Sequence, residues 1–378
     1  MQEKIQKKPL ELTAPALLSP EEPIEQSSPF LPMVHGKATD AIAQMTSKGK
    51  KVNPLTGSLT IEEREVKLVL QKFNDIAVTL GIKVHKLLSV GIAEFTASNN
   101  IGGKEDQALT YGVCIDLNEY AKKCGYNVTP HIQAGASPEA IAAEEKRANN
   151  ALKEARKKIK EDLQALSSSR ISWNESLKGK KSGDYVDIAI IGSHSIRKGF
   201  IYMVFDPVFA HYLTRLQITQ YPQALLAIDP RKSNAYNIGY AMSLHYNMDS
   251  NQKIGTAQLL RVSKLLEYTD LPTIATIRKQ RASWEARIKE PFETSLDALT
   301  ECGLLEDWRY SHSKGVELTD EEADFSNYEE WASTLVHFTL RNAPNHAPRL
   351  AARAEEKKAR QTKAKTKRTP KKKKPEDK

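Results

Sequence analysis

The sequence predicts an α+β fold, mainly helical, in which two similar units follow one another between an N-terminal arm and a basic C-terminal tail. In each half of the chain, a short helix is followed by a long amphipathic helix with bases on its free face. Each long helix leads into two β-rich segments with Lys or Arg at their turn. This order is that of a winged helix, so we expect one winged-helix domain at 56–220 and a second at 221–345.

The two ends of the chain differ in composition from these units. Residues 1–55 contain seven prolines and no sustained hydrophobic periodicity, which is typical of a disordered arm. Residues 346–378 are predicted to be a disordered Lys-rich tail, and within them 353–378 hold thirteen Lys or Arg against four acids. This excess equals the formal charge of the whole chain, +9. Residues 1–352 are therefore almost neutral, and the tail serves either non-specific polyanion binding or solubility.

The first unit begins near Leu59. The spacing of Val66, Val69, Leu70 and Phe73 predicts a helix that ends at Gly81, and VHKLLSVGIAEFTASNN predicts a second helix. A third helix opens at Asp116, three residues before Glu119, a capping-box spacing, and closes at Gly125. Ser137 and Pro138 are the N-cap and first residue of a long helix that reaches about Leu166.

This long helix has two chemically different sides. Its apolar side carries Leu152, Ala155, Ile159, Leu163 and Leu166. About 140° away, by the 100° per residue rule, cations and amides gather at Lys146, Asn149, Asn150, Lys153, Lys157, Lys160 and Gln164. A solvated helix face would also be rich in lysine. The amides favour DNA, because cations and amides together suit phosphates and base edges, so we expect the first six of these to bind DNA.

A hairpin is predicted to follow the long helix. Tyr185–Ile191 and Phe200–Phe205 are the expected strands, and residues 192–199 are the expected turn. Arg197 and Lys198 lie in this turn and are candidate DNA-binding residues. Turns are commonly polar, however, and two bases among eight residues are a weak signal by themselves.

The second unit shows the same plan. Residues 235–248 form one predicted helix, and another begins at the N-cap candidate Thr256 and ends before Pro272. The long helix has a single apolar stripe made of Trp284, Ile288, Phe292, Leu296 and Leu299. Pro291 either kinks this helix or restarts it, and Gly303 ends it. The segment LLEDWRYS, a turn at residues 313–315 and the strand VELT complete the predicted second wing.

Bases crowd the leading end of this second long helix, which is the end that usually meets base edges. Such a cluster is also common as solvated decoration, but its presence in both units favours DNA contact. The candidate DNA-binding residues of the second unit are Arg278, Lys279, Arg281, Arg287, Lys289 and, in the wing turn, Lys314.

With both units in view, the chain resembles the plasmid replication initiators of the RepA and RepB-like type over roughly residues 59–345. The resemblance is carried by GFIYMVFDPVFAHYL followed by SNAYNIGYAMSLHY, and by SWEARIKEPFETSLDALTECGLLEDWRY. It implies recognition of repeated origin sequences (iterons) in double-stranded DNA, help in opening the duplex, and recruitment of the host initiator and helicase. It also implies a homodimer that represses its own promoter and a monomer that starts replication. The Pro-rich arm and the loop at 127–135 depart from the compact pattern of these initiators.

Other functions find less support in the sequence. No His-x-His pair accompanies a candidate tyrosine nucleophile and no phosphate-binding G-x-x-x-x-G-K-[ST] loop occurs, so we expect no enzyme activity and no cofactor. Three dispersed cysteines favour neither a zinc site nor disulfides, and a reducing cytoplasm fits best. No apolar run reaches the roughly 18 residues of a membrane span, so no membrane partner is expected. A transcriptional regulator or partition factor is the main alternative, and a chromatin-like protein held on DNA by its tail is another.

Overall fold

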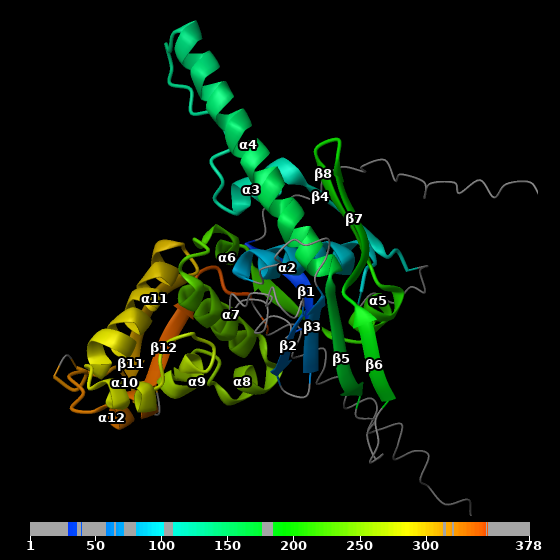
Figure 1. Ribbon diagram of the computed structural model, residues 1–378. Helices are drawn as coiled ribbons and strands as arrows, with labels where there is room; N and C mark the ends of the chain where they lie inside the picture. The colour runs from blue at the N-terminus through cyan, green and yellow to red at the C-terminus, as the bar shows by residue number, and fades with distance from the viewer. Residues whose placement is uncertain are drawn as a thin grey trace, which may run out of the picture.

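The chain folds into a mixed assembly of helices and small antiparallel sheets (Figure 1). The computed structural model describes residues 29–35, 39, 58–63, 66–71, 81–101, 109–175, 184–312, 315–319, 321–344 and 346. The α+β class predicted from the sequence is confirmed. Within this part of the chain, no helix has both the length and the apolar character needed to cross a membrane.

The first unit places three helices against a three-stranded sheet. In chain order its elements are α2 (Ile82–Ser98), β4 (Gly112–Asp116), α3 (Leu117–Lys123), α4 (Pro138–Ser167), β7 (Ile191–Arg197) and β8 (Phe200–Phe205). The strand order in the sheet is β4-β8-β7, with antiparallel neighbours. The predicted caps are confirmed, because the Asp116 side chain accepts from the Glu119 amide and the Ser137 side chain from the Ala140 amide.

A second sheet combines two strands that precede α2 with two strands that lie between α4 and β7. It has four strands, β2 (Ser58–Glu63), β3 (Val66–Gln71), β5 (Ser169–Glu175) and β6 (Asp184–Ala189), in the order β2-β3-β5-β6. The helix predicted from the spacing of Val66, Val69 and Leu70 is therefore wrong, because residues 66–71 are a strand. The segment VKLVLQ fits both periodicities, and β3 has a hydrogen-bonded partner on each side, β2 and β5, which decides in favour of a strand.

The segment predicted as a disordered arm contains a strand. Strand β1 (Phe30–His35) pairs antiparallel with β9 (Gln217–Pro222), and Phe30, Met33 and Val34 are buried. Burial of these apolar side chains stabilises the strand, although the proline content of the segment predicts disorder. Strand β9 also spans the predicted boundary between residues 220 and 221, so this boundary lies inside a strand of a shared sheet. The rest of the predicted arm lies largely outside the described residues, as does the tail from residue 347.

The second unit repeats the order of the first. Its elements are α7 (Ser233–Asn247), β10 (Leu259–Arg261), α9 (Val262–Leu266), α10 (Ile274–Gln280), the π-helical turn η1 (Glu285–Lys289), α11 (Glu290–Glu301), β11 (Leu305–Ser311) and β12 (Leu335–Leu340). The sheet order β10-β12-β11 matches β4-β8-β7, since in both sheets the last strand lies between the other two. Short helices α5 (Pro207–Thr214), α6 (Ala224–Ala227), α8 (Asp249–Ile254) and α12 (Tyr328–Ser333) complete the described fold.

Two predictions for the second unit are wrong in detail. Residues 259–261 form a strand that pairs with β12, so no helix begins at Thr256. The strand expected at 316–319 is limited to an isolated bridge between Ser311 and Glu317, and the return strand is β12, much later in the chain. In both places the chain pairs with a strand that is distant in sequence, instead of forming the helix or hairpin that the neighbouring residues predict.

The apolar stripe of the long helix is confirmed. Ile288, Phe292, Leu296 and Leu299 are each at most 1% exposed. Pro291 lies in the first turn of α11, directly after the π-helical turn, so the helix restarts there. Gly303, with φ of 78°, follows the end of the helix in the left-handed conformation that favours glycine.

The two units share one core through α2 and α7. The Tyr236 hydroxyl lies 2.6 Å from His85 Nδ1 and 3.0 Å from the Tyr221 hydroxyl, so a buried polar chain joins α2, α7 and β9. Burial lowers the pKa of His85 to about 3, so this imidazole is neutral at physiological pH. The buried apolar residues of both units form a single connected cluster around this junction.

Candidate nucleic-acid interface

Helix α4 presents the cationic face that the sequence predicts. Ala155, Ile159, Leu163 and Leu166 are buried, and Leu152 is partly buried against the same core. The candidate DNA-binding residues on the other side are all exposed: Lys146, Asn149, Asn150, Lys153, Lys157 and Lys160. Gln164, nearer the end of the helix, is partly buried. The amphipathic design of this helix is therefore as expected.

The N-terminal half of α4 projects from the body of the molecule (Figure 1). The loop that precedes the helix runs back along it and is held by Arg147, which donates to the carbonyl oxygens of Asn127 and Thr129 at 3.1 and 3.0 Å. Arg147 also pairs with Glu144 at 2.9 Å. The loop at 127–135 therefore supports the projecting helix, which leaves Lys146, Asn149 and Asn150 clear of the core.

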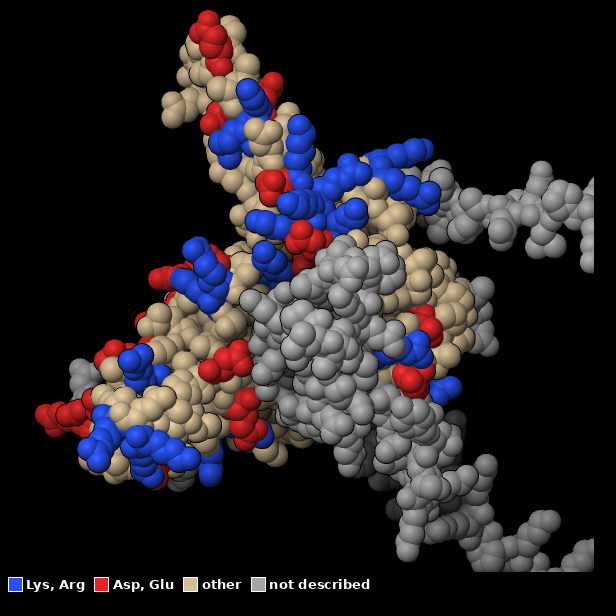
Figure 2. Space-filling view, in the orientation of Figure 1, with Lys and Arg blue, Asp and Glu red and all other residues tan. Residues whose placement is uncertain are grey.

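The hairpin β7–β8 lies against the C-terminal half of α4. Arg156 Nη2 donates to the Ile196 carbonyl at 3.1 Å. Burial lowers the pKa of His194, and the nearby charge of Lys160 lowers it further. These contacts place the bases of α4 beside β7, and Figure 2 shows Lys and Arg side chains gathered where the helix and the hairpin meet.

The turn of this hairpin is tighter than predicted. Strand β6 belongs to the four-stranded sheet, so the hairpin is β7–β8 and its turn is Lys198 and Gly199. Both residues have positive φ, 51° and 82°, as a two-residue hairpin turn of the primed type requires. Arg197 ends β7 and its guanidinium lies 5.0 Å from the centre of the Tyr202 ring. Arg197 and Lys198 are both exposed, at the tip rather than within a long loop.

Sequence reasoning missed Arg156, which links helix and hairpin. At 100° per residue, it lies on the same side of α4 as Lys153 and Lys160, so helical periodicity alone could have included it. Its hydrogen bond to Ile196 fixes the hairpin relative to the cationic face.

The basic residues of the second unit are less uniformly exposed and unpaired than those on the cationic face of α4. Arg278 and Lys279 occupy the last turn of α10, and Arg281 follows in a left-handed conformation with φ of 52°. Arg278 pairs with Glu329 of α12 at 2.5 Å, and Lys289 Nζ lies 5.4 Å from the centre of the Phe325 ring. Lys279, Arg281 and Arg287 are exposed, whereas Lys314 lies outside the described residues.

Helix α11 differs from α4 in charge. It has no Lys or Arg and carries Glu290, Glu293, Asp297 and Glu301. Tyr310 donates to Glu293 at 2.9 Å and the Trp308 indole donates to Asp297 at 3.0 Å, so two of these acids are engaged by β11. Only the leading end of this helix, with Arg287 and Lys289 in η1, has the charge that phosphates attract.

In the described part of the chain, His, Cys, Asp and Glu form no cluster of three or more that could hold a metal ion. Comparison with known proteins adds no further guide: no family model matches the chain, and no curated protein matches it. The function is therefore inferred from the geometry of the chain itself.

Proposed function

We propose that the chain is a sequence-specific binding protein for double-stranded DNA, built from two tandem winged helices, that initiates replication at repeated origin sequences. The fold assignment is supported by the repeated order of helices and strands and by the matching sheet orders β4-β8-β7 and β10-β12-β11. Two such units on one chain gain affinity when both engage one duplex. Recruitment of a host initiator and helicase, and a dimeric repressor form, belong to the same proposal.

The observation that carries the proposal is the combination of a projecting helix with a basic hairpin beside it. The exposed Lys and Asn side chains of α4 match the phosphates and base edges of a major groove. The Arg197–Lys198 tip, held to the helix through Arg156, is placed to reach the neighbouring backbone. On the face shown in Figure 2, a second group of bases lies over α10, at the far end of the second unit. A single duplex needs both groups on one face.

The test of the first unit is the salt dependence of DNA binding. Lys153, Lys157 and Lys160, all changed to Ala, should weaken binding to every duplex and reduce the salt slope by about one unit for each phosphate that is no longer neutralised. The matched control changes Lys232, Lys253 and Lys264, which are exposed lysines outside α4, to Ala and should leave the slope unchanged. An unchanged slope in the folded α4 variant would remove this helix from the interface.

The test of the second unit is footprinting on an origin fragment. Two protected patches should lie on one face of the duplex, about one helical turn or roughly 10 base pairs apart. Changing Arg281 and Arg287 to Ala should relax specificity in one patch only, at a cost of about 1–3 kcal/mol for each base that the variant no longer reads. A single short patch would mean that the second unit binds a protein instead. Direct repeats next to the coding region, with loss of plasmid maintenance in the same variants, would separate an initiator from a regulator.

A further inference from the structure

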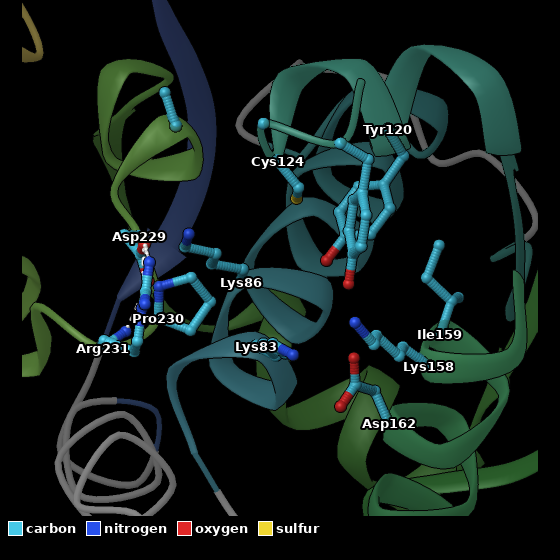
Figure 3. Close-up of a pocket in the computed structure, with 13 residues that line it drawn as sticks. Lys83, Lys86, Tyr120, Cys124, Lys158, Ile159, Asp162, Asp229, Pro230 and Arg231 are labelled. Atoms are coloured by element: carbon cyan, nitrogen blue, oxygen red, sulfur yellow. Dashed lines mark hydrogen bonds and ion pairs between the residues drawn. The ribbon is translucent and has the colours of Figure 1, made fainter. Parts of the chain in front are cut away.

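A cavity of about 410 Å³ lies between the helices of the first unit and the connector to the second, away from the hairpin side of α4. Its walls come from α2, α3, α4 and the connector that leads from α6 to α7 (Figure 3). This volume is in the range of small-molecule sites. The lining residues are Lys83, Lys86, Tyr120, Cys124, Gly125, Tyr126, Lys158, Ile159, Asp162, Ala227, Asp229, Pro230 and Arg231.

Cationic groups from two helices converge in this cavity. Lys83 projects from the first turn of α2 and Lys158 from α4, and Figure 3 shows both ammonium groups pointing into the same space as Asp162 and Tyr120. Lys158 Nζ lies 5.8 Å from the centre of the Tyr126 ring. Among the residues that the structure describes, neither lysine is within ion-pair distance, 4.0 Å, of a carboxylate.

The acids of the cavity do not balance these cations. Asp229 is engaged by Arg231, with 2.7 Å between the guanidinium and the carboxylate. Burial raises the pKa of Asp162 to about 7, so this carboxyl is partly protonated near neutral pH. A third lysine, Lys86, is 1% exposed and donates to the carbonyl oxygens of Leu226 and Ile228 at 2.8 and 2.5 Å. The cavity therefore has an excess of positive charge with hydroxyl and carboxyl groups beside it.

We propose that this cavity binds a small phosphate-bearing anion, with Lys83 and Lys158 as its principal ligands and the Tyr120 side of the cavity as its floor. Phosphate suits the site because its several oxygens can accept from two ammonium groups that approach from different helices. A DNA backbone does not reach the floor, since Tyr120 is 4% exposed and Ile159 is 1% exposed.

A bound anion would connect α4 to the connector between the units. Lys158 and Asp162 belong to α4, whereas Asp229 and Arg231 belong to the segment that enters α7. Lys86 already holds this connector through Leu226 and Ile228. The site is thus placed where occupancy would stabilise one position of the projecting helix relative to the second unit.

The test is isothermal titration calorimetry of the full-length protein without DNA, so that its outcome is independent of the DNA-binding proposal. The probes are inorganic phosphate, pyrophosphate, adenosine monophosphate and adenosine. Phosphate-bearing probes should bind and adenosine should not. Tighter binding of adenosine monophosphate than of inorganic phosphate would identify a nucleotide site, and the reverse order would identify an inorganic anion site.

The variants that decide the proposal change charge without changing the core. The double variant K83Q/K158Q should bind about tenfold or more weakly, because removing a charge-assisted hydrogen bond costs at least a factor of this order. The matched control K253Q/K264Q removes two charges from exposed lysines that lie outside both the cavity and α4, and it should bind as the unaltered protein does. D162N should bind at least as tightly as the unaltered protein.

Several results would overturn the proposal. These are no binding of any phosphate-bearing probe at millimolar concentration, equal weakening in K83Q/K158Q and in the control, or binding of spermidine that D162N abolishes. The last result would identify a cation site instead. Circular dichroism of each variant checks that the fold is retained, as expected for side chains that are partly or fully exposed.

Discussion

Acidification should change the stability of the protein in opposite directions through Asp162 and through His85. Replacing Asp162 by Asn should therefore make the protein sensitive to acid. Burial lowers the pKa of His85 from 6.5 to about 3. The unfolded chain then takes up a proton below pH 6.5 that the folded state refuses, and stability falls as the pH falls. Burial raises the pKa of Asp162 from 3.8 to about 7. The folded state then keeps a proton that the unfolded chain releases above pH 3.8, and stability rises as the pH falls from 7.

The magnitude follows from the overlap of these two windows. One unmatched proton changes the free energy of unfolding by about 1.36 kcal/mol per pH unit. Between about pH 6.5 and 4, each group therefore contributes roughly 3 kcal/mol, with opposite signs. The two contributions nearly cancel in the unaltered protein. Without the Asp162 carboxyl, only the His85 contribution remains. As the pH falls from about 6.5 to 4, D162N should therefore lose about 3 kcal/mol of unfolding free energy relative to the unaltered protein.

The assay is urea unfolding of both proteins at a series of pH values from about 4 to 6.5. The difference in unfolding free energy between the two proteins is the informative quantity, because the other titrating groups cancel in it. E154Q is the matched control, since Glu154 is an exposed acid on the same helix, about two turns before Asp162. Its difference from the unaltered protein should not vary steeply with pH. Parallel curves for D162N and the unaltered protein would refute this account of the Asp162 carboxyl.

Three further predictions test the core, the junction and the tail. Phe292→Ala should cost about 3–5 kcal/mol in urea unfolding, because Phe292 is 0% exposed and its ring centre lies 5.5 Å from that of Trp331. Retained stability with loss of single-stranded DNA binding would instead make it a base-stacking residue. Tyr236→Phe should lower the free energy of unfolding by about 1–3 kcal/mol, because it removes the hydroxyl that bonds to His85 Nδ1 and to the Tyr221 hydroxyl. Unchanged stability would contradict a structural role for these buried hydrogen bonds. Deletion of residues 353–378 should lower affinity for random DNA at low salt and leave the preferred sequence unchanged, whereas equal affinity for random DNA would limit the tail to solubility.

Local signals in the sequence were sufficient for several helices. The caps at Asp116 and Ser137, the buried stripe of α4 and the stripe through Phe292 were all predicted correctly. These features depend on residues three or four apart, which helical hydrogen bonds bring together without help from the rest of the chain. The exposed cationic face of α4 follows from the same periodicity, which is why most of the candidate interface was predictable.

Pairing between distant segments was decided by the tertiary structure. Nothing near Val66 indicates that its strand pairs with both β2 and β5, and nothing near residues 30–35 indicates β9 as a partner. The return strand β12 and the strand β10 were missed for the same reason, since a strand is stabilised by a partner whose sequence position local patterns do not encode.

The candidate sites show the same division. The sequence identified the bases of α4 and of the hairpin, but the contact of Arg156 with Ile196 sets the position of one against the other. The phosphate cavity left no trace in the sequence, because Lys83, Lys158 and Arg231 are separated by long stretches of chain. Helical periodicity determines which side chains share a face, whereas packing of remote elements determines which faces meet and what space remains between them.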